Sequence, residues 1–140
     1  MNGPPDPLRQ VGQWVEKAEH DLRNAEHTLT LDEDCPFDTV CFHAQQCAEK
    51  YLKAWLVYKA VDPPRTHDLV VLLKAAERLG LHGVSATDVQ TLNRYIIEAR
   101  YPGGWEPIER PEAEQAVKLG RRIRTAVRSL LPREALPGEG

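Results

Sequence analysis

The chain has 140 residues, 41% of them hydrophobic, which suits one domain with an apolar core of its own. Its net charge of −3 argues against a protein that coats nucleic acid without specificity, although a local basic surface remains compatible with it. The first residues lack the pattern of a secretory signal, and no run approaches the roughly 18 apolar residues of a membrane span. We therefore expect a cytoplasmic protein that makes no membrane contact.

Cysteine usage agrees with this compartment. Cys35, Cys41 and Cys47 are odd in number and lack the paired C-x-x-C spacing of a zinc site, so free thiols in a reducing environment are expected. The chain also lacks a glycine-rich phosphate loop and an HExxH motif. We therefore expect neither a cofactor nor a bound metal.

Apolar residues recur with the 3.6-residue period of helices almost throughout, and the alternation typical of strands is nearly absent. Five helical segments are predicted, at residues 8–31, 37–60, 68–79, 85–99 and 111–131. The second has the widest apolar face, which suits a central position. Asp62-Pro63-Pro64 closes it, because proline cannot continue the helical hydrogen-bond ladder.

Local signals mark several helix ends. Thr66 is the expected N-cap of the third segment, Gly80 ends it, and Ser85 with Asp88 resembles a capping box for the fourth. The short Pro/Gly connections favour antiparallel neighbours. The predicted fold is all-α, an up-and-down four- to five-helix bundle at residues 8–131 with one broken or short helix. Residues 1–7 are expected to be flexible, and 132–140 to form a disordered tail.

Polar residues share one face of the second segment. At 100° per residue, His43, Gln46, Lys50 and Lys53 fall in a stripe about 80° wide opposite the core, with Glu49 at its margin. We call this set the polar stripe. Its ammonium groups suit a phosphate and its amide suits a base or ribose. The alternative is an ordinary solvated outer face.

The residues of this segment carry a family resemblance. The run from His43 to Ala54 (HAQQCAEKYLKA), followed by Thr66-His67-Asp68-Leu69 and later by Ala99-Arg100-Tyr101-Pro102, resembles the HEPN family, the higher-eukaryote and prokaryote nucleotide-binding domain. The resemblance extends from about Trp14 to Leu131. It implies a four- or five-helix bundle that homodimerises and is often paired with a minimal nucleotidyltransferase in a toxin–antitoxin-like system.

Some members of this family are ribonucleases that share an Arg-x4–6-His motif, and this chain departs from that pattern. Arg100 is the natural candidate for the arginine, but no histidine occurs beyond His82. Arg23 and His27 have only three residues between them and lie in the first segment. Because metal-free RNA cleavage needs a positioned proton acceptor, the departure disfavours a nuclease.

Further candidates lie outside the second segment. His67 lies beside a helix start, where it can reach a ligand phosphate or simply cap the helix. Arg94, Tyr95, Arg100 and Tyr101 combine guanidinium groups with aromatic rings, which can hold phosphate and stack on a base. The alternative is that the tyrosines pack in the core and the arginines pair with Glu98 or Glu106. Gly120 indicates that another helix or a dimer partner approaches the last segment closely, and helix packing is the leading interpretation.

The leading hypothesis is a non-catalytic, homodimeric HEPN-type module that binds a nucleotide, RNA or a partner nucleotidyltransferase. Its predicted contacts are His43, Gln46, Glu49, Lys50, Lys53, His67, Arg94, Arg100 and Tyr101. Exposed apolar residues such as Phe42 and Leu56 would lie against the dimer partner. The alternative is a metal-independent ribonuclease that uses His43 or His67 beside Arg100 in place of the usual histidine. A third possibility is a structural adaptor without a ligand.

Overall fold

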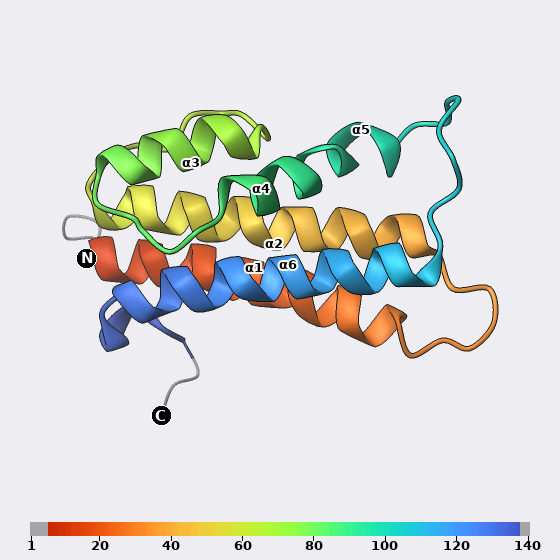
Figure 1. Ribbon diagram of the computed structural model, residues 1–140. Helices are drawn as coiled ribbons and strands as arrows, with labels where there is room; N and C mark the ends of the chain where they lie inside the picture. The colour runs from red at the N-terminus through yellow and green to blue at the C-terminus, as the bar shows by residue number, and fades with distance from the viewer. Residues whose placement is uncertain (1–5, 138–140) are drawn as a thin grey trace.

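Six α-helices make up the bundle in the computed structural model, which describes residues 6–137 (Figure 1). They are α1 (Pro7–Thr28), α2 (Phe37–Tyr58), α3 (Leu69–Arg78), α4 (Ala86–Asn93), α5 (Tyr95–Glu98) and α6 (Arg110–Leu130), followed by the 3₁₀ helix η1 (Arg133–Ala135). No strand occurs among the described residues. The predicted all-α bundle is confirmed.

The predicted helices match the observed ones with one difference in the fourth segment. That segment is broken at Arg94 into α4 and α5, where the backbone N–H of Ile97 bonds the carbonyl of Arg94 in a tighter turn. Asn93, just before the break, is engaged elsewhere: its side chain accepts from the N–H of Leu69 at 2.8 Å and donates to Asp68 at 3.1 Å. The end of α4 is thereby tied to the start of α3.

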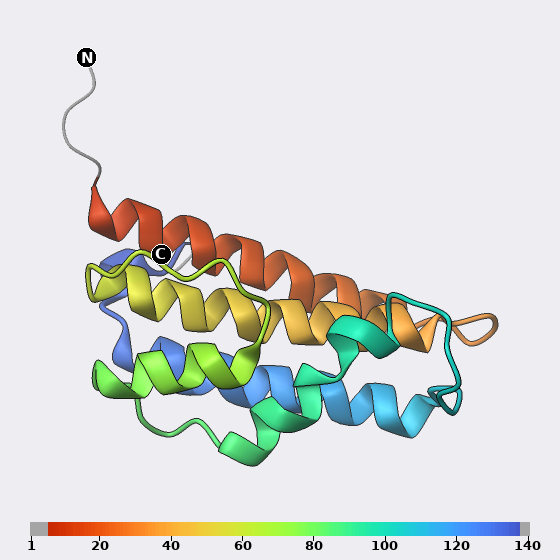
Figure 2. The same cartoon turned by 90° about the horizontal axis from the view of Figure 1, so that it is seen from above.

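Helix α2 is the centre of the bundle and packs against every other α-helix (Figure 2). Its buried residues surround most of its circumference, and Leu56 is fully buried, so our expectation that Leu56 is exposed was wrong. Gly120 of α6 meets the backbone of α2, since a Cβ there would lie 3.4 Å from the carbonyl oxygen of Ala44. The close helix approach that Gly120 indicated is confirmed.

The connection at residues 59–68 decides where α3 lies. It runs back beside α2, so that α3 starts near the middle of α2 and runs in the same direction as α2 (Figures 1 and 2). The N-cap of α3 is Asp68, whose carboxylate accepts from the N–H groups of Val70 and Val71. Thr66, the cap we expected, instead accepts from the N–H of Asp68. The capping role of Ser85 at α4 is confirmed.

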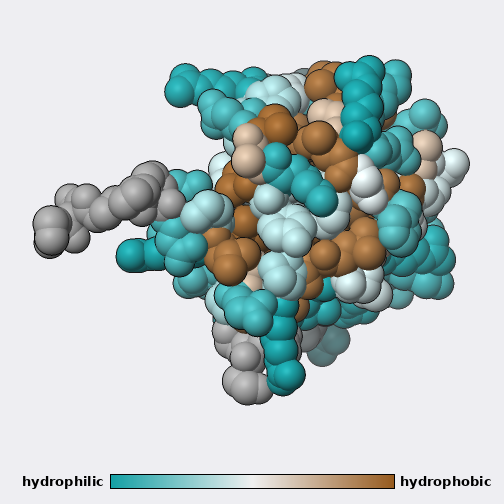
Figure 3. All heavy atoms as spheres, turned by 90° about the vertical axis from the view of Figure 1, so that its left-hand side faces the viewer, coloured by the Kyte–Doolittle hydropathy of each residue, from teal (hydrophilic) through white to brown (hydrophobic). Residues whose placement is uncertain are grey.

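The two ends of the chain differ from the prediction in part. Asp6 caps α1, which already begins at Pro7, and η1 packs against α1 with Ala135 buried. Residues 132–137, expected to be disordered, are therefore ordered, while the rest of the predicted flexible ends, 1–5 and 138–140, lies outside the described residues. At the end of the bundle seen in Figure 3, apolar patches lie between polar residues. No helix within residues 6–137 is long and apolar enough to cross a membrane.

Candidate functional site

Two buried carboxylates organise the polar stripe. Asp21, a residue of α1, accepts from the Nδ1 of His43 at 2.8 Å through one oxygen and from the ammonium of Lys50 at 2.5 Å through the other. We call these three residues the Asp21 unit. The imidazole and the ammonium are partly exposed, whereas the carboxylate is only 10% exposed. The α1–α2 interface thus positions His43 and Lys50 at its edge.

Glu49, six residues after His43 on α2, builds the same arrangement. One of its oxygens accepts from the Nδ1 of His67 at 2.9 Å, and the other accepts from the ammonium of Lys53 at 3.1 Å. We call these residues the Glu49 unit. Here both charged groups of α2 are buried, while the side chain of His67 is 56% exposed. Only the histidine of this unit reaches the surface.

The two glutamines join the returning connection to α2. Gln45, fully buried, donates to the backbone carbonyl of His67 at 3.1 Å. Gln46 donates to the side chains of Gln45 and Glu49, at 2.7 and 3.2 Å. His67 is therefore held through both its backbone and its imidazole. Residues of the Gln-Gln-x-x-Glu-Lys sequence and of Thr-His-Asp-Leu thus belong to one hydrogen-bonded network. This network gives a structural reason for the presence of both motifs in the chain.

The electrostatics of the Asp21 unit fix the state of the carboxylate. Burial by itself raises the pKa of Asp21, but hydrogen bonds from His43 and Lys50, with their charges, outweigh it and hold the pKa below its ordinary value. A carboxylate only accepts, so the Nδ1 of His43 is the donor. The same reasoning applies to His67 and Glu49. Among residues 6–137 neither histidine has a hydrogen-bond partner at Nε2, which leaves that nitrogen for a ligand.

A second group of residues lies where α5 ends beside the first half of α2. The guanidinium of Arg100 lies 5.3 Å from the ring centre of Phe42 and 6.0 Å from that of Tyr101. We call Phe42, Arg100 and Tyr101 the Arg100 site. The ring of Phe42 also meets that of His43 edge to face, with centres 5.7 Å apart. The Arg100 site therefore continues the polar stripe at its His43 end.

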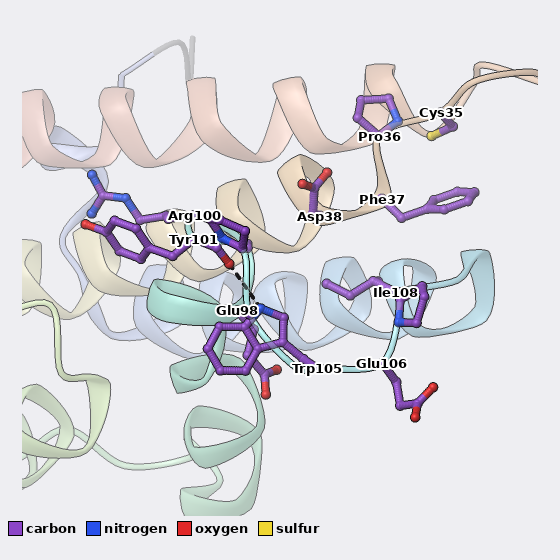
Figure 4. A pocket seen from close by; sticks show the side chains of 14 residues that line it. Cys35, Pro36, Phe37, Asp38, Glu98, Arg100, Tyr101, Trp105, Glu106 and Ile108 are labelled. Carbon is purple, nitrogen blue, oxygen red and sulfur yellow. Dashed lines mark hydrogen bonds between the residues drawn. The ribbon is translucent and has the colours of Figure 1, made fainter.

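The loop after α5 supports this site. The side chains of Arg100 and Tyr101 lie side by side and point away from Phe37 and Ile108 (Figure 4). The indole of Trp105 donates to the carbonyl of Tyr101 at 3.0 Å. Gly103 makes room for that indole, because a Cβ there would come within 2.6 Å of the ring. An open groove of about 600 Å³ lies between this loop and the start of α2, and Arg100 and Tyr101 are among the residues that line it.

Arg94 is not part of this surface. Its guanidinium donates to Glu98 at 2.6 Å and to Glu112 of α6 at 3.2 Å. Tyr95 is buried, and its hydroxyl donates to the same carboxylate of Glu112 at 2.6 Å. Burial and this hydrogen bond raise the pKa of Tyr95. The structural alternative that we weighed for Arg94 and Tyr95 is therefore the observed one, with Glu112 as an additional partner.

The structure thus divides the predicted site residues into groups. His43, Gln46, Lys50, His67, Arg100 and Tyr101 reach the surface along one edge of α2 or beside it. Glu49 and Lys53 do not, and our placement of Lys53 on an outer face was wrong, because its ammonium is buried against Trp14 of α1 and pairs with Glu49. Sequence reasoning did not include Asp21, Gln45 or Phe42 among the site residues. The available signals were that Gln45 belongs to the HEPN-like run and that Phe42 directly precedes it, whereas no local signal pointed to Asp21.

The cysteines and metal ligands add no further site among residues 6–137. Cys35, Cys41 and Cys47 are free thiols, and burial raises the pKa of Cys41 to about 12. No three His, Cys, Asp or Glu side chains gather as a metal site in the described part of the chain.

Comparison with known proteins places the chain in a family. The protein TT1696 from Thermus thermophilus is 29% identical and superposes with a TM-score of 0.72 over 88% of this chain and 99% of that one. ST0689, an archaeal HEPN homologue, is 24% identical, with a TM-score of 0.64 over 85% and 95% of the two chains, and shares the fold. No curated protein matches the chain. The HEPN domain model matches residues 11–130, and the chain belongs to the HEPN domain family.

Proposed function

We propose that this chain is a non-catalytic module that binds nucleotides or RNA at the Arg100 site. Arg100 binds a phosphate through its N–H donors, and the exposed ring of Tyr101 stacks on a base. Nucleotide or RNA binding agrees with membership of the HEPN family. The absence of a histidine after Arg100 in the sequence supports a non-catalytic role.

The observation that carries the proposal is the state of the Arg100 guanidinium. It is exposed, it lies against two aromatic rings, and within residues 6–137 no carboxylate forms an ion pair with it. Arg110 also lies over a ring, that of Phe37, but its donors bond the carbonyls of Leu29 and Leu31. A guanidinium that is positioned by stacking and keeps its donors available is suited to bidentate contact with phosphate.

Calorimetric titration with adenosine mono-, di- and triphosphate tests the proposal. The parent chain should bind at least one of them, and Arg100→Ala should weaken that binding by about tenfold or more, the effect of one charge-assisted hydrogen bond. Arg94→Ala is the matched control. It should bind like the parent, because in the parent chain Glu98 and Glu112 already neutralise the charge of Arg94. Equal binding by the parent and the Arg100 variant would refute the proposal.

A second candidate function, a metal-independent ribonuclease, is favoured by the geometry of His43. Its imidazole is oriented by Asp21, lies beside Phe42 and Arg100, and keeps Nε2 available to accept a proton from a 2′-hydroxyl. The 2′-oxygen would then bond to phosphorus, the bond to the 5′-oxygen would break, and that oxygen would take a proton from solvent. Arg100 would stabilise the charge on the phosphate during this step.

Incubation of metal-stripped protein with end-labelled RNA separates the two functions. The proposed binding module leaves the RNA intact with the parent chain. Cleavage by the parent that is lost in both His43→Ala and Arg100→Ala would establish the ribonuclease. Cleavage that survives both substitutions would point to a contaminating nuclease, which a repeat with independently purified protein would expose.

Homodimerisation and pairing with a minimal nucleotidyltransferase belong to the same proposal. They follow from the family resemblance, and the exposed side chains of Ile97 and Trp105 offer apolar surface on α5 and the loop after it. Light scattering of the purified chain tests homodimerisation. Co-purification with a nucleotidyltransferase encoded beside it tests the pairing.

A further inference from the structure

We propose that this chain has a second binding site, which takes a free α-amino acid between the first turn of α4 and the second half of α6. The site is an open groove of about 520 Å³, and its ionisable lining residues are His82, Asp88 and Arg122. We call it the Asp88 groove. It shares no residue with the Arg100 site, so this proposal does not depend on the proposed function.

The start of α4 turns Asp88 toward α6. Ser85 caps α4, and its hydroxyl accepts from the N–H of Asp88 at 3.3 Å. In a complete capping box, the side chain three residues after the cap returns to the N–H of the cap residue. Among residues 6–137 the carboxylate of Asp88 makes no such bond, and it lies 3.7 Å from the Nη1 of Arg122 in α6. The connection before α4 also approaches α6, since a Cβ on Gly83 would lie 3.8 Å from that of Ala126 (Figure 1).

The carboxylate of Asp88 is buried but lacks hydrogen-bond donors. Asp88 is only 9% exposed, and no N–H or O–H group of residues 6–137 donates to its carboxylate. The 3.7 Å contact with Arg122 is an ion pair that is too long for a hydrogen bond. Burial of a charge without donors is costly, so buried polar groups ordinarily have a partner. Because Asp88 lines the groove, a ligand there can supply the donor.

Arg122 has the complementary requirement. Its side chain is half exposed, and it makes no hydrogen bond within the described part of the chain. Its neighbours on α6, Arg121 and Arg124, instead pair with Glu26 and Glu19 of α1. The Asp88 groove therefore holds a carboxylate that needs donors beside a guanidinium that needs acceptors.

A free α-amino acid satisfies both groups at once. Its ammonium donates to the carboxylate of Asp88, and its carboxylate accepts from the guanidinium of Arg122, in charge-assisted hydrogen bonds. The two charged groups of the ligand are joined through one carbon atom, which suits two site charges that lie side by side. Thr125, Ala126 and Ser129 also line the groove, so a small or hydroxyl-bearing side chain on the amino acid fits it.

Other classes of ligand suit this groove less well. A phosphate would place its negative charge beside Asp88. A nucleobase ordinarily stacks on an aromatic ring, and no Phe, Tyr or Trp occurs among the described residues that line the groove. A metal ion would find too few ligands, because residues 6–137 contain no group of three His, Cys, Asp or Glu side chains that could hold one.

An NMR titration of the isotope-labelled chain with glycine, L-alanine and L-serine tests the proposal. At least one of them should shift the amide signals of residues 85–88 and 122–129 and saturate with a Kd of about 1 mM or tighter, a value within reach of so small a ligand. Ethylamine and propionate are alanine without its carboxylate and without its amino group. Each should bind at least about tenfold more weakly than alanine, because each loses one charge-assisted contact.

Substitutions at the two charges locate the site. Asp88→Asn and Arg122→Gln should each weaken amino-acid binding by about tenfold or more. Arg121→Gln is the matched control and should bind like the parent, because Arg121 pairs with Glu26 and does not line the groove. Circular dichroism and thermal unfolding confirm that each variant is folded. Arg122 is half exposed, so its variant decides the test if the Asp88 variant does not fold.

Each of the opposite results would overturn the proposal. These are no binding of any of the three amino acids, binding of ethylamine or propionate as tight as that of alanine, and unweakened binding by a folded variant at Asp88 or Arg122. Shifts confined to the signals of Arg100 and Tyr101 would also overturn it, because they would place the amino acid in the other site. AMP titration of the same samples tests the proposed function separately.

Discussion

The chain contains Arg-Tyr twice, six residues apart, and the two copies have opposite surroundings. Arg94 and Tyr95 share Glu112, and Tyr95 is buried. Arg100 and Tyr101 lie exposed, against Phe42 and beside Trp105, with no acid paired to the guanidinium in the described part of the chain. The same residue types therefore join α5 to α6 in one place and form a candidate binding surface in the other. The neighbouring carboxylates decide between these roles.

Removal of the buried tyrosine, Tyr95, tests whether the first Arg-Tyr pair has a structural role. Tyr95→Ala deletes a fully packed ring and leaves Glu112 without one of its donors. We expect a loss of about 3–5 kcal/mol in the free energy of unfolding, as for other large aromatic residues in cores. Urea denaturation measures it. A loss below about 1 kcal/mol would mean that Tyr95 does not anchor α5.

The Asp21 unit should also behave as a structural element, with a pH dependence of known sign. The pKa of Asp21 is lowered in the folded chain, so its stabilising effect is complete above the ordinary pKa near 4 and is lost as the pH falls further. Asp21→Asn should therefore lower the free energy of unfolding by about 1.5–3 kcal/mol at neutral pH. The difference from the parent should shrink below about pH 4, as denaturation at a series of pH values would show. A difference that grows in acid would contradict this sign.

Removal of the exposed tyrosine should affect binding and leave stability unchanged. Tyr101→Ala should weaken nucleotide or RNA binding by about 1–3 kcal/mol, the range for one stacked base. Its side chain is 57% exposed, so the unfolding midpoint should stay within error of the parent. Anisotropy and thermal unfolding of the same preparation measure both quantities. Tyr101→Phe retains the ring and should bind like the parent, and equal weakening by both variants would exclude stacking.

The smallest expected effect is that of Arg94→Ala. The ion pairs of Arg94 are half exposed, and such pairs contribute about 0–1 kcal/mol. We expect a slight loss of stability by denaturation and unchanged nucleotide affinity. Substantial loss of affinity would mean that Arg94, despite its acid partners, contacts the ligand, and the contrast between the two Arg-Tyr pairs would fail.

The sequence predicted the helices well because each signal is local. The 3.6-residue period, the capping serine at Ser85 and the breaks at Pro63 and Gly80 act over a few residues. One broken or short helix was predicted, but its position at Arg94 was not, because the side chain of Asn93 contacts the start of α3, 24 residues earlier in the chain. The confirmed HEPN resemblance likewise rested on a local run and its distance to Thr-His-Asp-Leu.

The candidate site was less predictable, because helical spacing gives the direction of a side chain and not what covers it. Lys50 and Lys53 fall in one stripe on a helical wheel, yet Lys53 is buried and lies 5.7 Å from the ring centre of Trp14 in α1. Asp21 lies 22 residues before His43, and Glu112 lies 18 after Arg94. Such partners are set by tertiary packing. Without knowledge of these tertiary partners, the ion-paired Arg94 and the exposed Arg100 could not be distinguished.

The most direct test of this contrast is an NMR titration that follows the side-chain Nε–Hε signals of the arginines while a short single-stranded RNA is added. The account predicts that the Arg100 signal shifts in proportion to the bound fraction, while the Arg94 signal, whose Nε is bonded to Glu98, stays in place. Binding that shifts Arg94 and leaves Arg100 unchanged would contradict the account and move the site to α4 and α6.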